Sequence, residues 1–191
     1  ELVFANLDVD FGRTEADEEI QDLLKFSEGL NLALHFLSGA IAYDSSVKVD
    51  PLLASKIVWL DAFITNIDRT HKNTNLLMWH QELWVIDNGA SFYFHHSWMN
   101  FKKHALSPFV YIKDHVLLDQ ATQLDEADSF AKTVLTDEIL HEIVELIPTD
   151  WLQWQDTDDS PEEIKKVYYN FLKTRLENSA NFLNEAKNAR A

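Results

Sequence analysis

Residues 66–89 read NIDRTHKNTNLLMWHQELWVIDNG, and this window is the most informative part of the chain. Its first ten residues are polar and show no periodicity, which is typical of a loop. Two apolar runs follow, residues 76–79 and 83–86, on either side of a three-residue polar break, and this pattern predicts a β-hairpin. Because a hairpin runs out and back, it should return Asp87 to the end at which the loop began.

We therefore expect Asp68 and Asn73, which lie five positions apart in the loop, to converge with Asp87. Mg²⁺ prefers hard oxygen ligands and keeps several waters, so a carboxylate, an amide oxygen and substrate phosphates can complete its coordination shell. A separate carboxylate can orient an acceptor hydroxyl and take its proton. The pattern D-x-x-x-x-N, hairpin, D-x-G therefore indicates phosphoryl transfer. The alternative is that Asp68 and Asn73 are ordinary capping residues, since Asp and Asn are common in turns.

The sequence before this window predicts two short strands and one buried helix. The apolar segments Glu1–Asp8 and Asn31–Leu37 are extended in character, and Ser38-Gly39 ends the second. Asp50-Pro51 is a good helix start, with Asp as the N-cap and Pro at the first helical position. Apolar residues then recur at three- and four-residue spacing, which predicts a mostly buried helix over Pro51–Thr65. These residues are Leu53, Ile57, Leu60 and Ile64.

The sequence after the window predicts mainly helices. We expect a short helix over Asp114–Thr122 and another over Thr136–Ile147. Ser160-Pro161-Glu162-Glu163 is a capping box, and it should open one long helix. That helix is expected to bury Ile164, Val167, Phe171, Leu176 and Leu183. The predicted fold class is α+β and mostly helical.

Composition excludes several classes of function. The 16 Lys and Arg against 32 Asp and Glu give a net charge of −16, which argues against binding nucleic acid or an anionic membrane. Without cysteine there is no Cys-ligated zinc, iron–sulfur cluster or thiol nucleophile. The four glycines are not spaced for a Rossmann site or a P-loop. No basic leader or membrane-length apolar run occurs, so we expect a cytoplasmic location.

The loop and the D-x-G motif together resemble the HipA-like kinases, a divergent bacterial branch of the protein-kinase-like fold. In that family the catalytic loop also ends in Lys-Asn, which Lys72-Asn73 matches here. By position, the resemblance implies that Asp68 is the catalytic base and that Asn73 and Asp87 are Mg²⁺ ligands. It also gives Lys72 a catalytic contact to phosphate, the alternative being an exposed lysine that only aids solubility.

The resemblance further implies a division into two parts. Residues 41–191 would form a protein-kinase-like C-lobe that contains the hairpin, and residues 1–40 would supply residual N-lobe strands and the hinge. The implied nucleotide-binding residues are Phe36, Leu37, Ser38 and Gly39. The implied activity is an ATP- and Mg²⁺-dependent serine/threonine protein kinase. Its implied partners are a protein substrate and an antitoxin or other regulatory protein.

The sequence also departs from the family pattern. Asn88 stands where many kinases have the Phe of D-F-G, and His71 follows Asp68 by three positions, where better-known members have two. The chain contains no Gly-rich loop and no V-A-I-K-type lysine, so we expect these elements to precede Glu1 and the chain alone to be inactive. Two alternatives stay open: a pseudokinase or interaction module without turnover, and a metal-dependent hydrolase that uses Asp68, His71 and Asp87.

Overall fold

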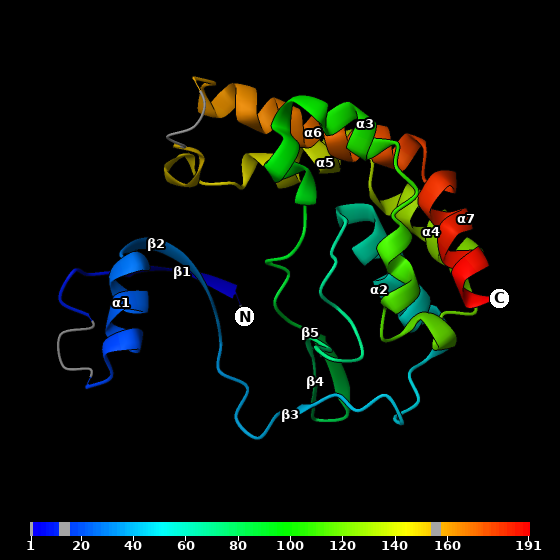
Figure 1. Cartoon of the computed structure of the whole chain (residues 1–191), viewed down its shortest axis with the longest axis horizontal. Coiled ribbons are helices and arrows are strands. Elements are labelled where there is room, and N and C mark those ends of the chain that lie inside the picture. The colour runs from blue at the N-terminus through cyan, green and yellow to red at the C-terminus, as the bar shows by residue number, and fades with distance from the viewer. Residues whose placement is uncertain (1, 12–15, 154–157) are drawn as a thin grey trace. The chain divides into compact units, whose positions relative to one another are not determined.

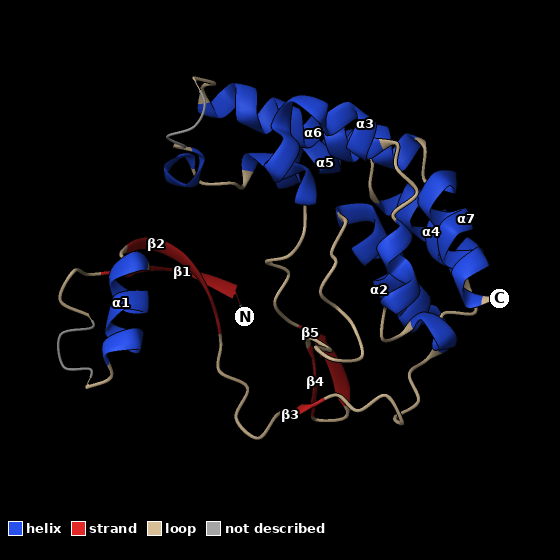
Figure 2. Cartoon of the chain, in the orientation of Figure 1, coloured by secondary structure: helices blue, strands red, loops and turns tan. Residues whose placement is uncertain are grey.

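The computed structural model describes residues 2–11, 16–153 and 158–191, apart from the side chains of His96 and Ser97. The fold is α+β, with two small antiparallel sheets (Figures 1 and 2). The predicted α+β class is confirmed, although helices make up about half of the described residues rather than most of them. The chain divides into two compact units, Glu1–Gly39 and Ala40–Ala191.

The first unit is a strand–helix–strand arrangement. Strands β1 (Leu2–Leu7) and β2 (Gly29–Leu34) pair antiparallel, and helix α1 (Glu18–Phe26) connects them. The strand expected over Asn31–Leu37 begins at Gly29 and ends at Leu34, because β1 supplies partners for those residues only. Gly29 has a φ of 98°, a conformation that favours glycine, so the ladder can begin there directly after the turn.

Helix α2 (Pro51–Ile64) is the central helix of the second unit. The Asp50 carboxylate caps it by accepting from the backbone N–H of Leu53 at 2.9 Å, and the helix ends at Thr65 with a left-handed φ of 58°. The predicted helix is confirmed, but the predicted buried stripe is only half right, because Leu53 and Leu60 are 41% and 40% exposed. The residues that it buries most deeply are Ala54, Ile57, Val58, Trp59, Ala62 and Phe63.

A three-stranded antiparallel sheet contains the predicted hairpin. Its order is β3–β4–β5, and a two-residue turn joins β4 (Leu76–Trp79) to β5 (Glu82–Val85). His80 and Gln81 in that turn have φ values of 50° and 68°, the paired left-handed conformation of a type I′ hairpin. The hairpin is confirmed. Strand β3 (Ile41–Ala42) is too short to carry a periodic pattern, and the sequence did not predict it.

The remainder of the second unit consists of α-helices and short 3₁₀ helices. In chain order they are η1 (Tyr93–Asn100), α3 (Phe101–Ala105), η2 (Val110–Asp114), η3 (Leu118–Gln120), α4 (Leu124–Val134), α5 (Asp137–Glu145), η4 (Thr149–Leu152), α6 (Pro161–Glu177) and α7 (Ala180–Arg190). Thr136 caps α5, and Ser160 opens α6 with the predicted capping box.

Two helix predictions need correction. The long helix expected after Ser160 is interrupted at Asn178 and Ser179, so α6 and α7 are separate helices. The range Asp114–Thr122, where a short helix is expected, contains instead the last residue of η2 and the whole of η3. His115 between them is extended and pairs with Thr70, which prevents a continuous helix.

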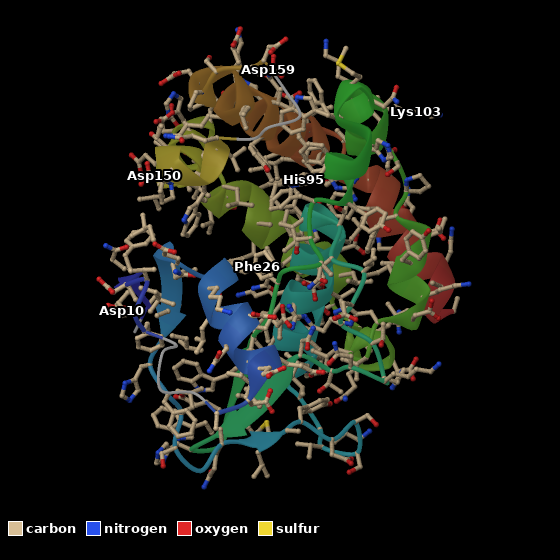
Figure 3. All side chains as sticks on the ribbon, turned by 60° about the vertical axis from the view of Figure 1, so that its left-hand side comes forward. Asp10, Phe26, His95, Lys103, Asp150 and Asp159 are labelled. Carbon is tan, nitrogen blue, oxygen red and sulfur yellow. The ribbon has the colours of Figure 1, made fainter. Side chains whose placement is uncertain are left out.

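An aromatic cluster joins η1 to α6. The rings of Phe94 and Phe171 stack with centroids 4.3 Å apart. His95, labelled in Figure 3, lies beside them with its ring Nε2 3.1 Å from the Tyr168 hydroxyl oxygen. The segment that follows β5 is thereby packed against α6.

Arg175 in α6 joins the end of α2 to neighbouring helices. Its guanidinium is fully buried and donates to the backbone oxygens of Ala62 and Phe63 in α2 and of Ala105 at the end of α3. The ring of Phe182 lies 4.8 Å from the guanidinium carbon, and burial lowers the pKa of Arg175 to about 9. Since the last carbonyls of a helix lack helical partners, Arg175 fixes the point at which the loop after α2 begins.

Within the described ranges, none of the helices combines the length and the apolar character that crossing a membrane requires.

Candidate functional site

The beginning of the polar loop after α2 is hydrogen-bonded to Asp61, an acidic residue within that helix. Asn66 donates from its backbone N–H to the Asp61 carbonyl at 2.8 Å, and from its Nδ2 to Asp61 Oδ1 at 3.1 Å. Asn66 Oδ1 accepts from the backbone N–H of Asp68 at 3.1 Å. The Ile67 N–H donates to the Ala90 carbonyl at 3.3 Å. The start of the loop is therefore anchored to α2 and to the segment that follows the hairpin.

Two side-chain amides hold the carboxylate of Asp68, which is half-buried. Asn73 Nδ2 donates to Asp68 Oδ2 at 2.6 Å, and Asn75 Nδ2 donates to the same oxygen at 3.2 Å. The Thr70 N–H donates to the Asn73 carbonyl at 2.9 Å, which closes the loop. The structure thus brings Asp68 and Asn73 together.

The hairpin returns Asp87 to this loop. Ile86 N–H donates to the Asn75 carbonyl at 3.0 Å, and Asn75 Nδ2 lies 3.4 Å from the Asp87 carbonyl oxygen. Asp87 is exposed and has a left-handed φ of 47°. Its Oδ1 accepts from the Gly89 N–H at 3.1 Å, and a Cβ at Gly89 would stand 3.2 Å from that oxygen. A larger residue at this glycine would therefore require the carboxylate to shift by a few tenths of an ångström.

A buried charged network, which the sequence analysis missed, lies beneath the loop. The Arg69 guanidinium is only 1% exposed and donates to both carboxylate oxygens of Asp61. It also donates to the side-chain oxygen of Asn88 and to the backbone oxygens of Asn75 and Ile86. One guanidinium therefore connects α2, the polar loop and the segment after β5.

His115 completes this network. The Leu117 N–H donates to His115 Nδ1 at 3.0 Å, so Nδ1 carries no hydrogen and Nε2 donates to Asp61 Oδ2 at 2.9 Å. Burial alone would raise the pKa of Asp61, but the hydrogen bonds from His115 and Arg69 outweigh it and hold the pKa below its ordinary value. Asp61 is therefore a carboxylate, and its charge neutralises the buried guanidinium.

One sequence signal could have found Asp61. It is the only acidic residue in α2, whose sequence is otherwise largely apolar, and a carboxylate at such a position needs a buried partner. No comparable signal marks His115, because it lies outside any periodic element and reaches Asp61 only through the tertiary fold.

The other predicted residues lie in two places. Lys72 and His71 are exposed on the loop, and the Lys72 ammonium has no hydrogen-bond partner within the described residues. Phe36–Gly39 follow β2 at the end of the first unit, where Gly39 has a φ of 80°. Their contact with a nucleotide stays a prediction.

The oxygen atoms of the site fit Mg²⁺. Asn73 uses its Nδ2 on Asp68, which leaves its Oδ1 available, and Asp87 uses one oxygen on Gly89, which leaves the other. Both side chains are exposed, so water can supply the remaining ligands. Across the described ranges, no three His, Cys, Asp or Glu side chains form a group that could hold a metal.

The sequence was compared with those of known proteins and families. A sequence model of the family described as HipA-like kinase matches residues 9–184, a range that contains the loop, the hairpin and Asp87. Neither the curated proteins nor the solved structures gave a match.

Proposed function

Because this chain belongs to the HipA-like kinase family, we propose that the intact protein transfers the γ-phosphoryl group of ATP, with Mg²⁺, to a serine or threonine hydroxyl of a protein. The observation that supports this best is the hydrogen bond from Asn73 Nδ2 to Asp68 Oδ2, with Asp87 joined to the pair through Asn75. In this arrangement Asp68 is a carboxylate that is not used to bind the metal, and Asn73 and Asp87 supply two oxygen ligands. Phosphoryl transfer requires this division of roles.

Each site residue has its own role in the proposed reaction. Asp87 and Asn73 would hold the metal through their free oxygen atoms, and Mg²⁺ when bound neutralises charge on the β- and γ-phosphates. Asp68 orients the acceptor hydroxyl and accepts its proton. Lys72 adds a positive charge next to Asn73, where it can contact phosphate. Most of the rate enhancement then comes from positioning and electrostatic stabilisation.

The same proposal assigns a kinase-like role to each unit. Residues 1–40 contribute the last strands of an N-lobe and the hinge, and residues 41–191 form the C-lobe. The backbone at Phe36–Gly39 then contacts the adenine. The resemblance of the sequence supports this assignment, as does the boundary between compact units directly after Gly39.

Transfer of labelled γ-phosphate by the intact protein tests the proposal. Asp68→Asn keeps the shape of the side chain and its capacity to accept amide hydrogen bonds, but it removes the proton acceptor. We expect transfer to fall at least ~10²-fold while ATP affinity changes little. Asp119→Asn in η3 removes the same charge from an exposed residue outside the site and should transfer at the wild-type rate. Transfer by Asp68→Asn at that rate would show that Asp68 is an ordinary loop residue.

A catalytically silent interaction module is the second candidate. It is favoured by the absence of a Gly-rich loop and a V-A-I-K-type lysine from the 191 residues. If the intact protein bound Mg-ATP but transferred phosphate neither to proteins nor to water, this second candidate would replace the first.

A further inference from the structure

Asn75 lies where the polar loop, β4 and the Asp87 segment meet. It is 9% exposed and has a φ of 47°, a left-handed conformation that asparagine tolerates better than most residues. Its carbonyl accepts from Ile86 N–H and from the Arg69 guanidinium. The backbone of Asn75 is therefore held from both sides.

The side chain of Asn75 acts on the carboxylate of Asp68. Asp68 Oδ2 accepts from Asn73 Nδ2 at 2.6 Å and from Asn75 Nδ2 at 3.2 Å, whereas Oδ1 accepts no hydrogen bond from the described residues. Two donors on one oxygen restrict rotation of the carboxylate. They also leave Oδ1 as the oxygen that is open to an acceptor hydroxyl.

The two amide donors differ in how firmly they are held. Asn73 is exposed, and its remaining oxygen is the one assigned to the metal, so its side chain has a second role besides holding Asp68. Asn75 is buried, its backbone is fixed, and its Nδ2 also lies 3.4 Å from the Asp87 carbonyl. Asn75 is therefore the donor that can hold Asp68 whether or not the metal is bound.

We propose that Asn75 is a positioning residue for phosphoryl transfer, because its amide fixes Oδ2 of Asp68 so that Oδ1 faces the acceptor. This inference rests on the proposed function. In the reaction, the hydroxyl proton passes to Asp68 Oδ1 while the hydroxyl oxygen bonds the γ-phosphorus. The bond from that phosphorus to the β–γ bridging oxygen breaks, and its electron pair leaves with ADP. Asp68 then releases the proton to solvent.

Asn75→Gly tests the role with little risk to the fold, because glycine adopts a φ of 47° without strain and keeps the backbone contacts. We expect kcat to fall about tenfold to a hundredfold, the cost of a misplaced catalytic group, with the KM for ATP within about twofold of wild type. Gln81→Gly is the matched control, since Gln81 also has a positive φ but lies in the exposed β4–β5 turn. It should match wild type.

Asn75→Asp provides a second, opposite change at the same position. It keeps the size of the side chain but turns the donor toward Asp68 into a second carboxylate, so kcat should fall below that of Asn75→Gly. An unchanged kcat in Asn75→Gly, or a loss that lies only in KM, would overturn the positioning role while wild-type transfer still stood. Absence of transfer by the wild type would instead contradict the proposed function itself.

A direct measurement of the contact does not depend on activity. In NMR spectra of the intact protein, Asp68→Ala should shift the Nδ2 proton resonances of Asn75 and leave those of Asn181, which donates to the Leu106 carbonyl, unchanged. Asn75 resonances that did not respond to Asp68→Ala would show that the amide does not hold the carboxylate, and the inference would fail.

Discussion

Asp87 and Asn73 offer the same kind of oxygen to a metal but differ in charge. Asp87 is the only carboxylate among the proposed Mg²⁺ ligands, so Asp87→Ala should abolish Mg²⁺-dependent nucleotide binding by the intact protein. Asn73→Ala should weaken the same binding less, because an amide contributes no charge. Calorimetry with ATP, with and without Mg²⁺, measures both effects. Unchanged Mg-ATP affinity in Asp87→Ala would remove Asp87 from the metal site.

Neighbouring residues in the loop have opposite environments. The Asp68 side chain is half-buried, and among the described residues only amides bind it, whereas the next side chain, Arg69, is buried and bonds Asp61 and Asn88. The environment of Asn88 accounts for its departure from the D-F-G pattern. An apolar residue at that position would leave a donor of Arg69 without its acceptor, so this chain requires an oxygen there.

The buried network connects three elements through the ion pair between Arg69 and Asp61. Breaking this pair should lower the free energy of unfolding substantially. Arg69→Met leaves Asp61 buried without its cation, and breaking such a pair typically costs about 3–5 kcal/mol of unfolding free energy. Urea unfolding at pH 7 measures the loss. Lys187→Met, which breaks the exposed pair with Asp125, is the control and should cost at most about 1 kcal/mol. Equal stability of the two variants at pH 7 would contradict this account of the network.

The same variant also tests how the contribution of the Arg69–Asp61 pair to the free energy of unfolding depends on pH. The folded pKa of Asp61 is lower than its unfolded value, so the stabilisation is fully present above an unfolded pKa of about 4. It is lost as pH falls below that value towards the folded pKa. The difference in unfolding free energy between wild type and Arg69→Met should therefore be largest at neutral pH and shrink on acidification. A difference that grew on acidification would have the wrong sign for a paired carboxylate.

Elements with local signals could be predicted from sequence. Asp50-Pro51 marks the start of α2, and the two apolar runs around a polar break mark the hairpin. Out-and-back topology then suffices to bring Asp87 near Asp68, so the centre of the candidate site follows from the sequence pattern. Strand β3 could not be predicted, because its two residues take their extended form from pairing with β4.

The supporting contacts of the site could not be predicted, because they depend on tertiary structure. His115 interrupts an expected helix to bond Asp61, and nothing in its local sequence favours that conformation. Asn75 has no signal that separates it from other polar loop residues until its neighbours on β5 are placed. The family resemblance assigns roles by position, and it does not describe the network beneath the loop.

The net charge of −16 affects the stability of the whole chain. The described ion pairs other than those of Asp61 involve partly exposed side chains, which water and salt weaken. Repulsion among the excess acids should therefore dominate at low salt. Raising NaCl from about 10 to about 200 mM, which shortens the screening length from roughly 30 Å to below 10 Å, should raise the urea midpoint at pH 7. A midpoint that fell would show that ion pairs outweigh the repulsion.

The proposed function requires that Asn73 and Asp87 hold the metal of a bound nucleotide beside Asp68. Paramagnetic Mn²⁺, used in place of Mg²⁺ with ATP, broadens NMR resonances close to the metal in the intact protein. We expect broadening of Asn73, Asp87 and Asp68, and loss of the effect in Asp87→Ala. Resonances of these three residues that stayed sharp, or broadening that persisted unchanged in Asp87→Ala, would contradict the proposed site.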